Sequence, residues 1–248
     1  MLRLSDVEVG ERLRVSALSL HPGLNVIVGM NGAGKSTLLD VIAGVLQPAR
    51  GRALLDDNDL ACMSPRQRAR LVASLGQEPS SSFHELSVQA RIAQGLAPRR
   101  GHNAGLDDEA RQRVAAVADE LGLASSLHRR LAQLSGGERR RAHVARVLVD
   151  EQAQVIVVDE PFAGLDRLAT SLLVTALRRR GERHTVVVSV HEVQTALALG
   201  GRLLGLHGGS IVVDGLLPQA LHEAGPVWGD VRVVVDGDYV GVLQKRPD

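Results

Sequence analysis

One short segment restricts the possible fold more than any other part of the chain. Residues 29–37 read Gly-Met-Asn-Gly-Ala-Gly-Lys-Ser-Thr and fit the phosphate-binding pattern G-x-x-x-x-G-K-[ST]. An apolar run at residues 26–28 predicts a strand before the segment, and residues 38–43 predict a helix after it. Backbone N–H groups of a glycine-rich turn at a helix N-terminus surround polyphosphates. The segment therefore predicts a strand–loop–helix nucleotide site.

The side chains of this phosphate loop have different expected tasks. Lys35 would reach the β- and γ-phosphates of ATP, and the hydroxyl of Ser36 would bind Mg²⁺. Among 29 basic residues only Lys35 and Lys245 are lysines, so the chain keeps a compact ammonium where the loop requires one. A glycine turn that binds nothing is the alternative, and the flanking strand and helix argue against it. Further ATP contacts are expected from Gly29, Asn31, Gly32, Ala33, Gly34 and Thr37.

The composition excludes several other classes of protein. No apolar run in the 248 residues approaches the ~20 that span a bilayer, and the N-terminus has no apolar signal core. The single cysteine, Cys62, excludes an internal disulfide and a cysteine-based metal cluster. With a formal net charge of +1 and 2% aromatic residues, neither attraction to nucleic acid nor base stacking is indicated. We expect a cytosolic globular protein that binds no nucleic acid.

The order of the other elements predicts an α/β fold with a mainly parallel sheet. Residues 2–9 alternate apolar and polar side chains as a half-buried strand does, and residues 13–20 do so less cleanly. Residues 154–159 form an apolar run that is typical of a central parallel strand. A helix over about 168–180 and a strand over 185–190 follow. This strand–helix–strand order implies right-handed crossovers.

Residues 78 to about 134 differ in character from the rest of the chain. Polar loops at 78–82 and 99–105 accompany helical patterns, of which the clearest covers residues 107–121 with one apolar face. This stretch predicts a helical insertion within the α/β core.

We therefore expect three parts along the chain. Residues 1–77 hold an antiparallel β region and the phosphate loop, residues 78–150 the helical part, and residues 151–248 the remainder of the core. The last part is expected to end in a hairpin, because an Asp-Gly pair at 236–237 separates two apolar runs.

A second glycine-rich segment indicates another anion site. Residues 134–138 read Leu-Ser-Gly-Gly-Glu and precede a helical stretch over residues 139–149. Ser135 and Glu138 have the spacing of a capping box. An ordinary helix start does not explain two consecutive glycines in the first turn, which cost roughly 1 kcal/mol each relative to alanine. Bare backbone at a helix N-terminus suits the close approach of an anion.

At this point the chain resembles the ATP-binding cassette family. Residues 134–138 look like its signature motif, and residues 155–160 look like its Walker B strand with the following catalytic glutamate. Residues 163–166 resemble its D-loop, Gln77 its Q-loop and His191 its switch histidine. With the phosphate loop, these elements stand in the family's order and spacing over nearly the whole chain. The resemblance implies a RecA-like P-loop NTPase fold with an antiparallel β subdomain and a helical insertion.

The resemblance also implies a role for each site residue. Asp159 would hold Mg²⁺ together with Ser36 and Gln77, directly or through water. Glu160, one residue further, would accept a proton from the attacking water or orient it. His191 would sense or stabilise the γ-phosphate, so that Glu160, His191 and Gln77 form the catalytic set. Nucleotide contacts outside the phosphate loop are implied for Ser135, Gly136, Gly137 and Asp166.

The implied partners follow from how family members assemble. Two cassettes pair head to tail, and each signature motif closes over the nucleotide of the other cassette. Every element occurs once here, so the partner would be another chain, most simply a second copy related by a two-fold axis. The implied complex also contains integral membrane permease subunits. The cassettes would bind these subunits at the cytoplasmic face of the inner membrane and would work indirectly with a substrate-binding protein. The sequence predicts a short helix after Ser64. In this feature the chain resembles the ATPase subunits of cobalamin, ferric-siderophore and haem importers.

Other functions remain as alternatives. One is the ATPase of an exporter, and another is a non-transport cassette ATPase of the kind that acts in repair or translation. Those non-transport proteins commonly carry two cassettes or a long coiled-coil insertion in one chain, and this sequence has neither. A module that senses ATP without turnover is disfavoured by the complete set of Lys35, Ser36, Asp159, Glu160 and His191.

One departure from the family pattern concerns adenine. The family usually places an aromatic residue near the end of the first strand, where it stacks on the base. Residues 9–13 contain none, so Arg12 or Arg14 would have to stack instead. The departure affects the expected selectivity for the base and leaves the phosphate chemistry unchanged.

Overall fold

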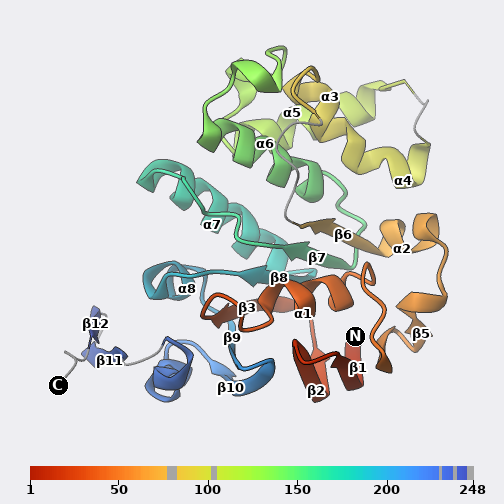
Figure 1. Ribbon diagram of the computed structural model, residues 1–248. Helices are drawn as coiled ribbons and strands as arrows, with labels where there is room; N and C mark the ends of the chain where they lie inside the picture. The colour runs from red at the N-terminus through yellow and green to blue at the C-terminus, as the bar shows by residue number, and fades with distance from the viewer. Residues whose placement is uncertain (77–82, 102–104, 229–230, 237–238, 245–248) are drawn as a thin grey trace.

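A six-stranded sheet forms the centre of the structure (Figure 1). Five neighbouring strands are parallel, and a sixth strand is antiparallel at one edge, in the order β10-β9-β3-β8-β7-β6. The strands are β3 Gly23–Gly29, β6 Val72–Leu75, β7 Val155–Val158, β8 Thr185–Ser189, β9 Arg202–His207 and β10 Ser210–Leu216. The computed structural model describes the chain except for residues 77–82, 102–104, 229–230, 237–238 and 245–248.

Strand β7 shows why this sheet is buried on both faces. Val155 and Val157 belong to one hydrophobic core, and Ile156 and Val158 belong to another. Successive side chains of a strand point to opposite faces, so a continuous apolar run supplies both cores at once. The prediction of a central parallel strand at residues 154–159 is confirmed.

An antiparallel sheet and helix α1 (Lys35–Ile42) cover one face of the central sheet and share a core with it. The strand order is β2-β1-β4-β5. In β2 the buried positions alternate with exposed ones except at the middle, which is the pattern of a sheet with one solvated face. The antiparallel region expected near the N-terminus is therefore confirmed. Its strands are β1 Leu2–Val9, β2 Leu13–Leu20, β4 Arg50–Leu55 and β5 Asn58–Asp59.

Helices cover the opposite face of the central sheet (Figure 1). The helical insertion contributes α3 Val88–Ala93, α4 Ala97–Arg100, α5 Asp108–Glu120 and α6 Gly136–Leu148. Helices α7 Arg167–Gly181 and α8 Val193–Leu199 follow later in the chain. Apolar residues of α3, α5, α6 and α7 pack in one cluster with the sheet, so the insertion is continuous with the main core. The helix expected over residues 107–121 is confirmed as α5, with Asp107 as its N-cap.

Several boundaries and elements differ from the sequence-based expectation. Strand β6 begins at Val72, directly after Leu71, the last residue of α2 (Pro65–Leu71). Strands β9 and β10 and helix α8 were not anticipated. Strand β9 gains its position from parallel pairing with β3, which lies more than 170 residues earlier. The terminal hairpin is confirmed as β11 (Val231–Asp236) paired with β12 (Tyr239–Gln244).

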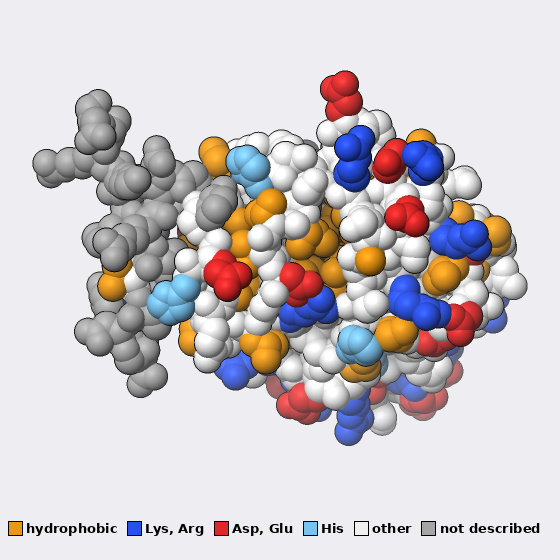
Figure 2. All heavy atoms as spheres, turned by 90° about the horizontal axis from the view of Figure 1, so that it is seen from below, with side chains coloured by type: hydrophobic (Ala, Val, Ile, Leu, Met, Phe, Trp, Pro, Cys, Tyr) orange, Lys and Arg blue, Asp and Glu red, His pale blue; other side chains and the backbone are white. Residues whose placement is uncertain are grey.

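The surface carries charges of both signs. On the face shown in Figure 2, apolar side chains gather near the middle, and basic and acidic side chains are interspersed around them. Among the described residues, no helix combines the length and the apolar character that a membrane crossing requires.

Candidate nucleotide site

The phosphate loop is shaped by glycines and by a buried lysine. Strand β3 ends at Gly29, and α1 begins at Lys35 after a turn in which Gly34 has a φ of +99°. A Cβ at Gly34 would also lie 2.6 Å from the carbonyl oxygen of Arg12, so glycine is required there. Lys35 is 5% exposed, and its Nζ donates to the carbonyl oxygens of Gly29 at 2.9 Å and Met30 at 3.2 Å. The loop is thus already closed around the ammonium group.

Negative charge gathers beside this lysine. Strand β8 pairs with β3 on one side and β7 on the other, so the residues after β7 and β8 reach the sheet edge where the loop lies. Burial lowers the pKa of Lys35, and the charges of Glu160 and Asp159 act in the opposite direction. Burial and the charge of Asp159 raise the pKa of Asp40 in α1. The loop lysine and both carboxylates therefore act on one another electrostatically.

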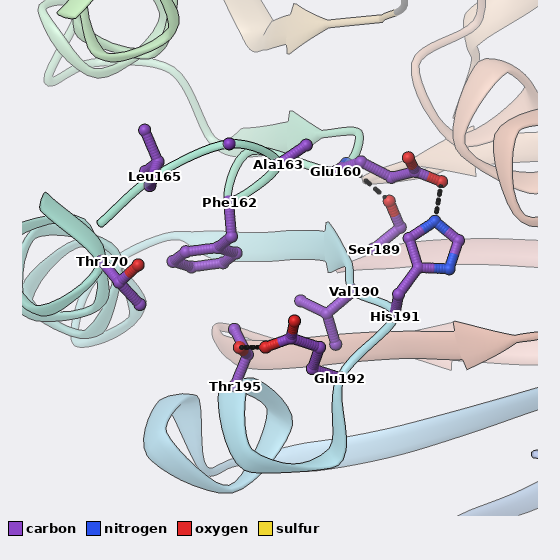
Figure 3. A pocket seen from close by; sticks show the side chains of 11 residues that line it. Glu160, Phe162, Ala163, Leu165, Thr170, Ser189, Val190, His191, Glu192 and Thr195 are labelled. Carbon is purple, nitrogen blue, oxygen red and sulfur yellow. Dashed lines mark hydrogen bonds and ion pairs between the residues drawn. The ribbon is translucent and has the colours of Figure 1, made fainter. Parts of the chain in front are cut away.

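Glu160 and His191 lie in direct contact (Figure 3). Oε1 of Glu160 and Nε2 of His191 are 2.5 Å apart, and the two side chains are 27% and 42% exposed. Glu160 has a φ of +47°, in the left-handed region that residues with a side chain rarely adopt. A pocket of about 230 Å³, lined in part by Phe162 and Leu165, opens beside the pair.

Two further side chains hold the backbone of Asp159 and Glu160. Ser189 Oγ accepts from the backbone N–H of Glu160 at 2.8 Å and donates to Oδ1 of Asp159 at 2.5 Å. From α6, Nη2 of Arg140 donates to the carbonyl oxygens of Asp159 at 2.7 Å and Glu160 at 2.5 Å. The turn after β7 is therefore tied to β8 on one side and to the helix of the glycine-rich segment on the other.

The second glycine-rich segment begins α6 as the capping box predicts. Ser135 Oγ accepts from the backbone N–H of Glu138 at 3.2 Å, and the Glu138 carboxylate accepts from the N–H of Ser135 at 2.9 Å. Ser135 and Gly136 are exposed, and Gly137 is the second residue of the helix. Helices α6 and α1 pack on opposite faces of the central sheet (Figure 1). The helix that begins at this segment therefore lies across the sheet from the chain's own phosphate loop.

The other residues predicted for the site differ in their surroundings. Asp166 is the N-cap of α7, where its carboxylate accepts from the backbone N–H of Ala169 at 2.8 Å. Its carboxylate thus has a structural partner inside the chain. Gln77, predicted as a catalytic and Mg²⁺-binding residue, lies outside the described residues, as does the polar loop 78–82. Asn31 and Gly32 are exposed in the phosphate loop, whereas Ser36 and Thr37 lie in the first turn of α1.

The two arginines considered for adenine contact differ in surroundings. Both side chains are exposed, and Nε of Arg14 lies 3.7 Å from the carboxylate of Glu8. The backbone of Arg12 packs against Gly34 of the phosphate loop and against Gly209 in the turn between β9 and β10. Arg12 is thus the arginine whose backbone adjoins the loop.

Three residues near the site were not singled out from the sequence. The sequence could have indicated Ser189, because it is the hydroxyl residue among the four valines of residues 186–190. Arg140 lies in a run of three arginines, residues 139–141, and such a run indicates only a solvated helix face or a local contact. Trp228 donates its indole N–H to the carbonyl oxygen of His191 at 3.1 Å, across 37 residues of sequence. Nothing local in the sequence indicates that contact.

Comparison with known proteins decides the family. Residues 13–163, more than half of the chain, match the family described as ABC transporter. The chain belongs to this family. It is an ATP-binding ATPase subunit of a transporter, as the arrangement of its sequence motifs predicted.

Members of the family with full-length similarity carry import functions in their names. A hemin import ATP-binding protein, HmuV, of Rhodopseudomonas palustris is 37% identical over 92% of this chain and 85% of its own length. A thiamine import ATP-binding protein, ThiQ, of Chelativorans sp. is 35% identical over 88% of this chain and 86% of its own length. Two different import cargoes thus appear at nearly the same level of identity.

Solved structures of ABC cassettes show the same fold. An ATP-binding subunit of an ABC transporter superposes with a TM-score of 0.77 at 23% identity, covering 92% of this chain and 94% of its own. A dimeric bacterial ABC transporter cassette superposes with a TM-score of 0.76 at 21% identity, covering 88% of this chain and 99% of its own. The predicted P-loop NTPase fold is confirmed.

The residues present suit the Mg²⁺ ion that the family implies. Among the described residues, no group of three or more His, Cys, Asp or Glu side chains forms a metal site. Mg²⁺ does not need such a cage, because one or two protein oxygens combine with water and nucleotide phosphates. Asp159 is 2% exposed, and one of its carboxylate oxygens accepts a hydrogen bond from Ser189. The charge of Asp159 raises the pKa of Asp40 in α1, the helix that also contains Ser36. A hard divalent cation fits these oxygen donors.

Proposed function

We propose that this chain hydrolyses ATP with Glu160 as the group that receives the proton of the attacking water. The carrying observation is the 2.5 Å contact between Glu160 and His191, at the sheet edge where β3 delivers the phosphate loop. A carboxylate at this edge, next to a histidine and a buried lysine, suits proton transfer beside a polyphosphate.

The proposed chemistry relies on position and charge. Lys35 and the loop N–H groups hold the phosphates of ATP, and the water attacks the γ-phosphorus as the bond to ADP breaks. Glu160 accepts the water's proton, and His191 orients the Glu160 carboxylate through their contact. Mg²⁺, held by Ser36 and Asp159, would neutralise phosphate charge. We propose that Gln77 acts with these residues, in the catalytic and Mg²⁺-binding role that the resemblance implies.

We also propose that two copies share their ATP sites. Ser135 and Gly136 are exposed at the N-terminus of α6, a helix that packs on the face of the central sheet opposite to α1 and its phosphate loop. A second copy related by a two-fold axis can bring this anion site to the ATP held by Lys35. A solved cassette with the same fold is dimeric, which supports a dimer of this chain.

For the transported cargo we propose hemin. The HmuV relative covers 92% of the chain, and hemin falls within the class of importers that the sequence resembles. Thiamine is the second candidate, since a ThiQ relative is 35% identical over 88% of the chain. The cassette itself would act from the cytoplasmic face of the inner membrane, where ATP is available, and would dock to permease subunits through the helical part after Gln77.

ATP turnover is tested first on the purified chain. We expect phosphate release that depends on Mg²⁺ and is lost in Lys35→Ala together with ATP binding, because the ammonium group neutralises the phosphates. Lys245→Ala, the other lysine of the chain, serves as the matched control and should retain activity. Absence of phosphate release from the wild-type chain, alone and with its permease, would overturn the proposal.

The cargo is tested on the complex with its permease in lipid vesicles. Uptake of labelled hemin and labelled thiamine is measured on the same preparation, with Glu160→Gln as the turnover-deficient control. We expect ATP-dependent uptake of hemin. Uptake of thiamine alone would replace the first candidate by the second, and uptake of neither would reject both cargoes while leaving the ATPase assignment intact.

A further inference from the structure

Ser189 is a fully buried hydroxyl residue at the end of a strand, directly after three valines. It is 0% exposed, and β8 is buried along its whole length. In the pairing of β7 with β8, Val158 lies opposite Val188, so Ser189 follows at the level of Asp159. A hydroxyl at such a position must be hydrogen-bonded, or its burial is costly.

The hydroxyl makes two bonds that only a combined donor and acceptor can make. Its oxygen accepts the N–H of Glu160 at 2.8 Å (Figure 3), and its proton goes to Oδ1 of Asp159 at 2.5 Å. Serine and threonine can do both with one atom, whereas alanine and valine can do neither. The bridge joins the neighbouring residues that the proposed function assigns to Mg²⁺ and to water activation.

The backbone of Glu160 needs such support. Its φ of +47° is unfavourable for a residue with a side chain, and such conformations persist only where the surroundings hold them. The N–H of Glu160 is held by Ser189, and its carbonyl oxygen is held by Arg140. Loss of the Ser189 bond would leave this N–H group without its partner and would allow the peptide to rotate.

We propose that Ser189 is a positioning residue for ATP hydrolysis. Its hydroxyl keeps the Asp159 carboxylate and the Glu160 peptide in one geometry, and it thereby fixes where the Glu160 carboxylate meets the attacking water. Ser189 touches neither ATP nor water in this role. The inference rests on the proposed role of Glu160 and adds the residue that places it.

The experiment compares Ser189→Ala with a matched loss of a buried serine hydroxyl. Ser126 is 4% exposed and lies in the helical part, so Ser126→Ala is the control. Steady-state kcat and KM for ATP, the unfolding midpoint, and binding of a fluorescent ATP analogue with and without Mg²⁺ are measured for both. Ser189→Thr, which keeps the hydroxyl, is the rescue variant.

For Ser189→Ala we expect a fall in kcat of about 10- to 100-fold, the range typical of residues that orient a catalytic or metal-binding group. Affinity for the ATP analogue without Mg²⁺ should stay unchanged, and the Mg²⁺-dependent gain in affinity should shrink. Ser189→Thr should recover most of the activity, and Ser126→Ala should resemble the wild type. In a Glu160→Gln background, Ser189→Ala should cause little further loss of turnover, because both changes remove the same function.

The inference fails if Ser189→Ala keeps kcat within about twofold of wild type. It also fails if kcat falls only in proportion to the folded fraction, since the hydroxyl would then serve stability alone. If Ser189→Ala does not fold, Ser189→Cys replaces it, because the thiol has a similar size and bonds weakly. An undiminished Glu160→Gln would instead reject the proposed function, whatever Ser189→Ala does.

Discussion

At the scale of single residues, the site depends on a few atoms held in unusual positions. Lys35 is buried against the carbonyl oxygens of its own loop, and Glu160 adopts a left-handed backbone beside His191. Both features cost free energy in a chain without ATP. Their presence is reasonable if ATP binding and hydrolysis use them.

The Glu160 carboxylate is the first target for substitution. Glu160→Gln retains the size and the hydrogen bonding to His191 but removes the proton acceptor, so turnover should fall by about 100-fold or more while ATP binding survives. Phosphate release and equilibrium binding of ATP are the two measurements. Glu151→Gln, at an exposed position shortly before β7, is the control. Near wild-type hydrolysis by Glu160→Gln would show that another group activates the water.

Base selectivity is a second residue-scale prediction. No aromatic side chain stands at residues 9–13, and a stacked ring is worth ~1–3 kcal/mol per base in other nucleotide sites. We therefore expect weak discrimination between ATP and GTP, measured as the ratio of their dissociation constants. Arg12→Ala should weaken binding of both nucleotides similarly if its guanidinium stacks on the base. A preference for ATP above about a hundredfold would mean that a group other than a stacked ring reads the base.

At the scale of elements, helix termini decide how the site is assembled. Both α6 and α7 are capped internally, α6 by Ser135 and α7 by Asp166. They differ in their first turns, because α6 begins with two glycines, of which Gly136 is exposed, whereas α7 begins with Arg167. Bare backbone allows an anion to approach closely, so the two termini have different expected roles, although the sequence places nucleotide contacts at both.

Variants of Asp166 separate capping from nucleotide contact. Asp166→Ala removes the acceptor for the N–H of Ala169 and should lower the free energy of unfolding by about 1 kcal/mol. Asp166→Ser restores a capping oxygen and should recover the stability in denaturant unfolding. Asp166→Ser with normal stability but a large loss of ATP turnover would favour the predicted nucleotide contact.

The contact of Trp228 with the loop after β8 allows a direct optical measurement. Trp228 is the single tryptophan of the chain, and its indole N–H donates to the carbonyl oxygen of His191 at 3.1 Å. If His191 moves when ATP binds, the emission of Trp228 should change on adding ATP to Glu160→Gln and change less with ADP. Constant emission at saturating ATP would mean that His191 keeps its place relative to Trp228.

At the scale of the whole molecule, the central sheet separates the helix of the phosphate loop from the helix of the second glycine-rich segment. Helix α1 packs on one face, and α6 packs on the other, within a core that also includes the helical insertion. One chain therefore offers half of each proposed shared site. The activity of the molecule should then depend on assembly rather than on the single chain.

Mixing two inactive variants tests this dependence. Lys35→Ala removes a phosphate contact, and Ser135→Arg blocks the N-terminus of α6. A mixed dimer carries one site with both defects and one site with neither, so it should retain ATP binding at the intact site, with partial hydrolysis if one site acts alone. ATP stoichiometry and light scattering provide the measurements. Monomers under all ATP conditions, also with the membrane partners, would exclude the shared-site dimer.

The local features of this protein follow from the sequence by itself. The phosphate loop, the N-cap at Ser64, the capping box at Ser135, and the carboxylates Asp159 and Glu160 are recognisable because their interactions or patterns lie within a few residues of each other. The pattern of apolar residues likewise predicts the strands near both ends of the chain and helix α5. Short-range hydrogen bonds and periodicity depend on neighbouring residues, and neighbouring residues are what a sequence displays.

Only the tertiary structure decided which distant residues meet. The bridge from Ser189 to Glu160 spans 29 residues, the bonds of Arg140 to the turn after β7 span up to 20, and Trp228 reaches His191 across 37. The sequence of strand β9 likewise has no distinctive pattern, and its parallel pairing with β3 is what identifies it as a strand. These contacts depend on the order of strands in the sheet and on which face each helix covers. Packing of the whole chain sets both, because each core needs apolar residues from segments far apart in the sequence.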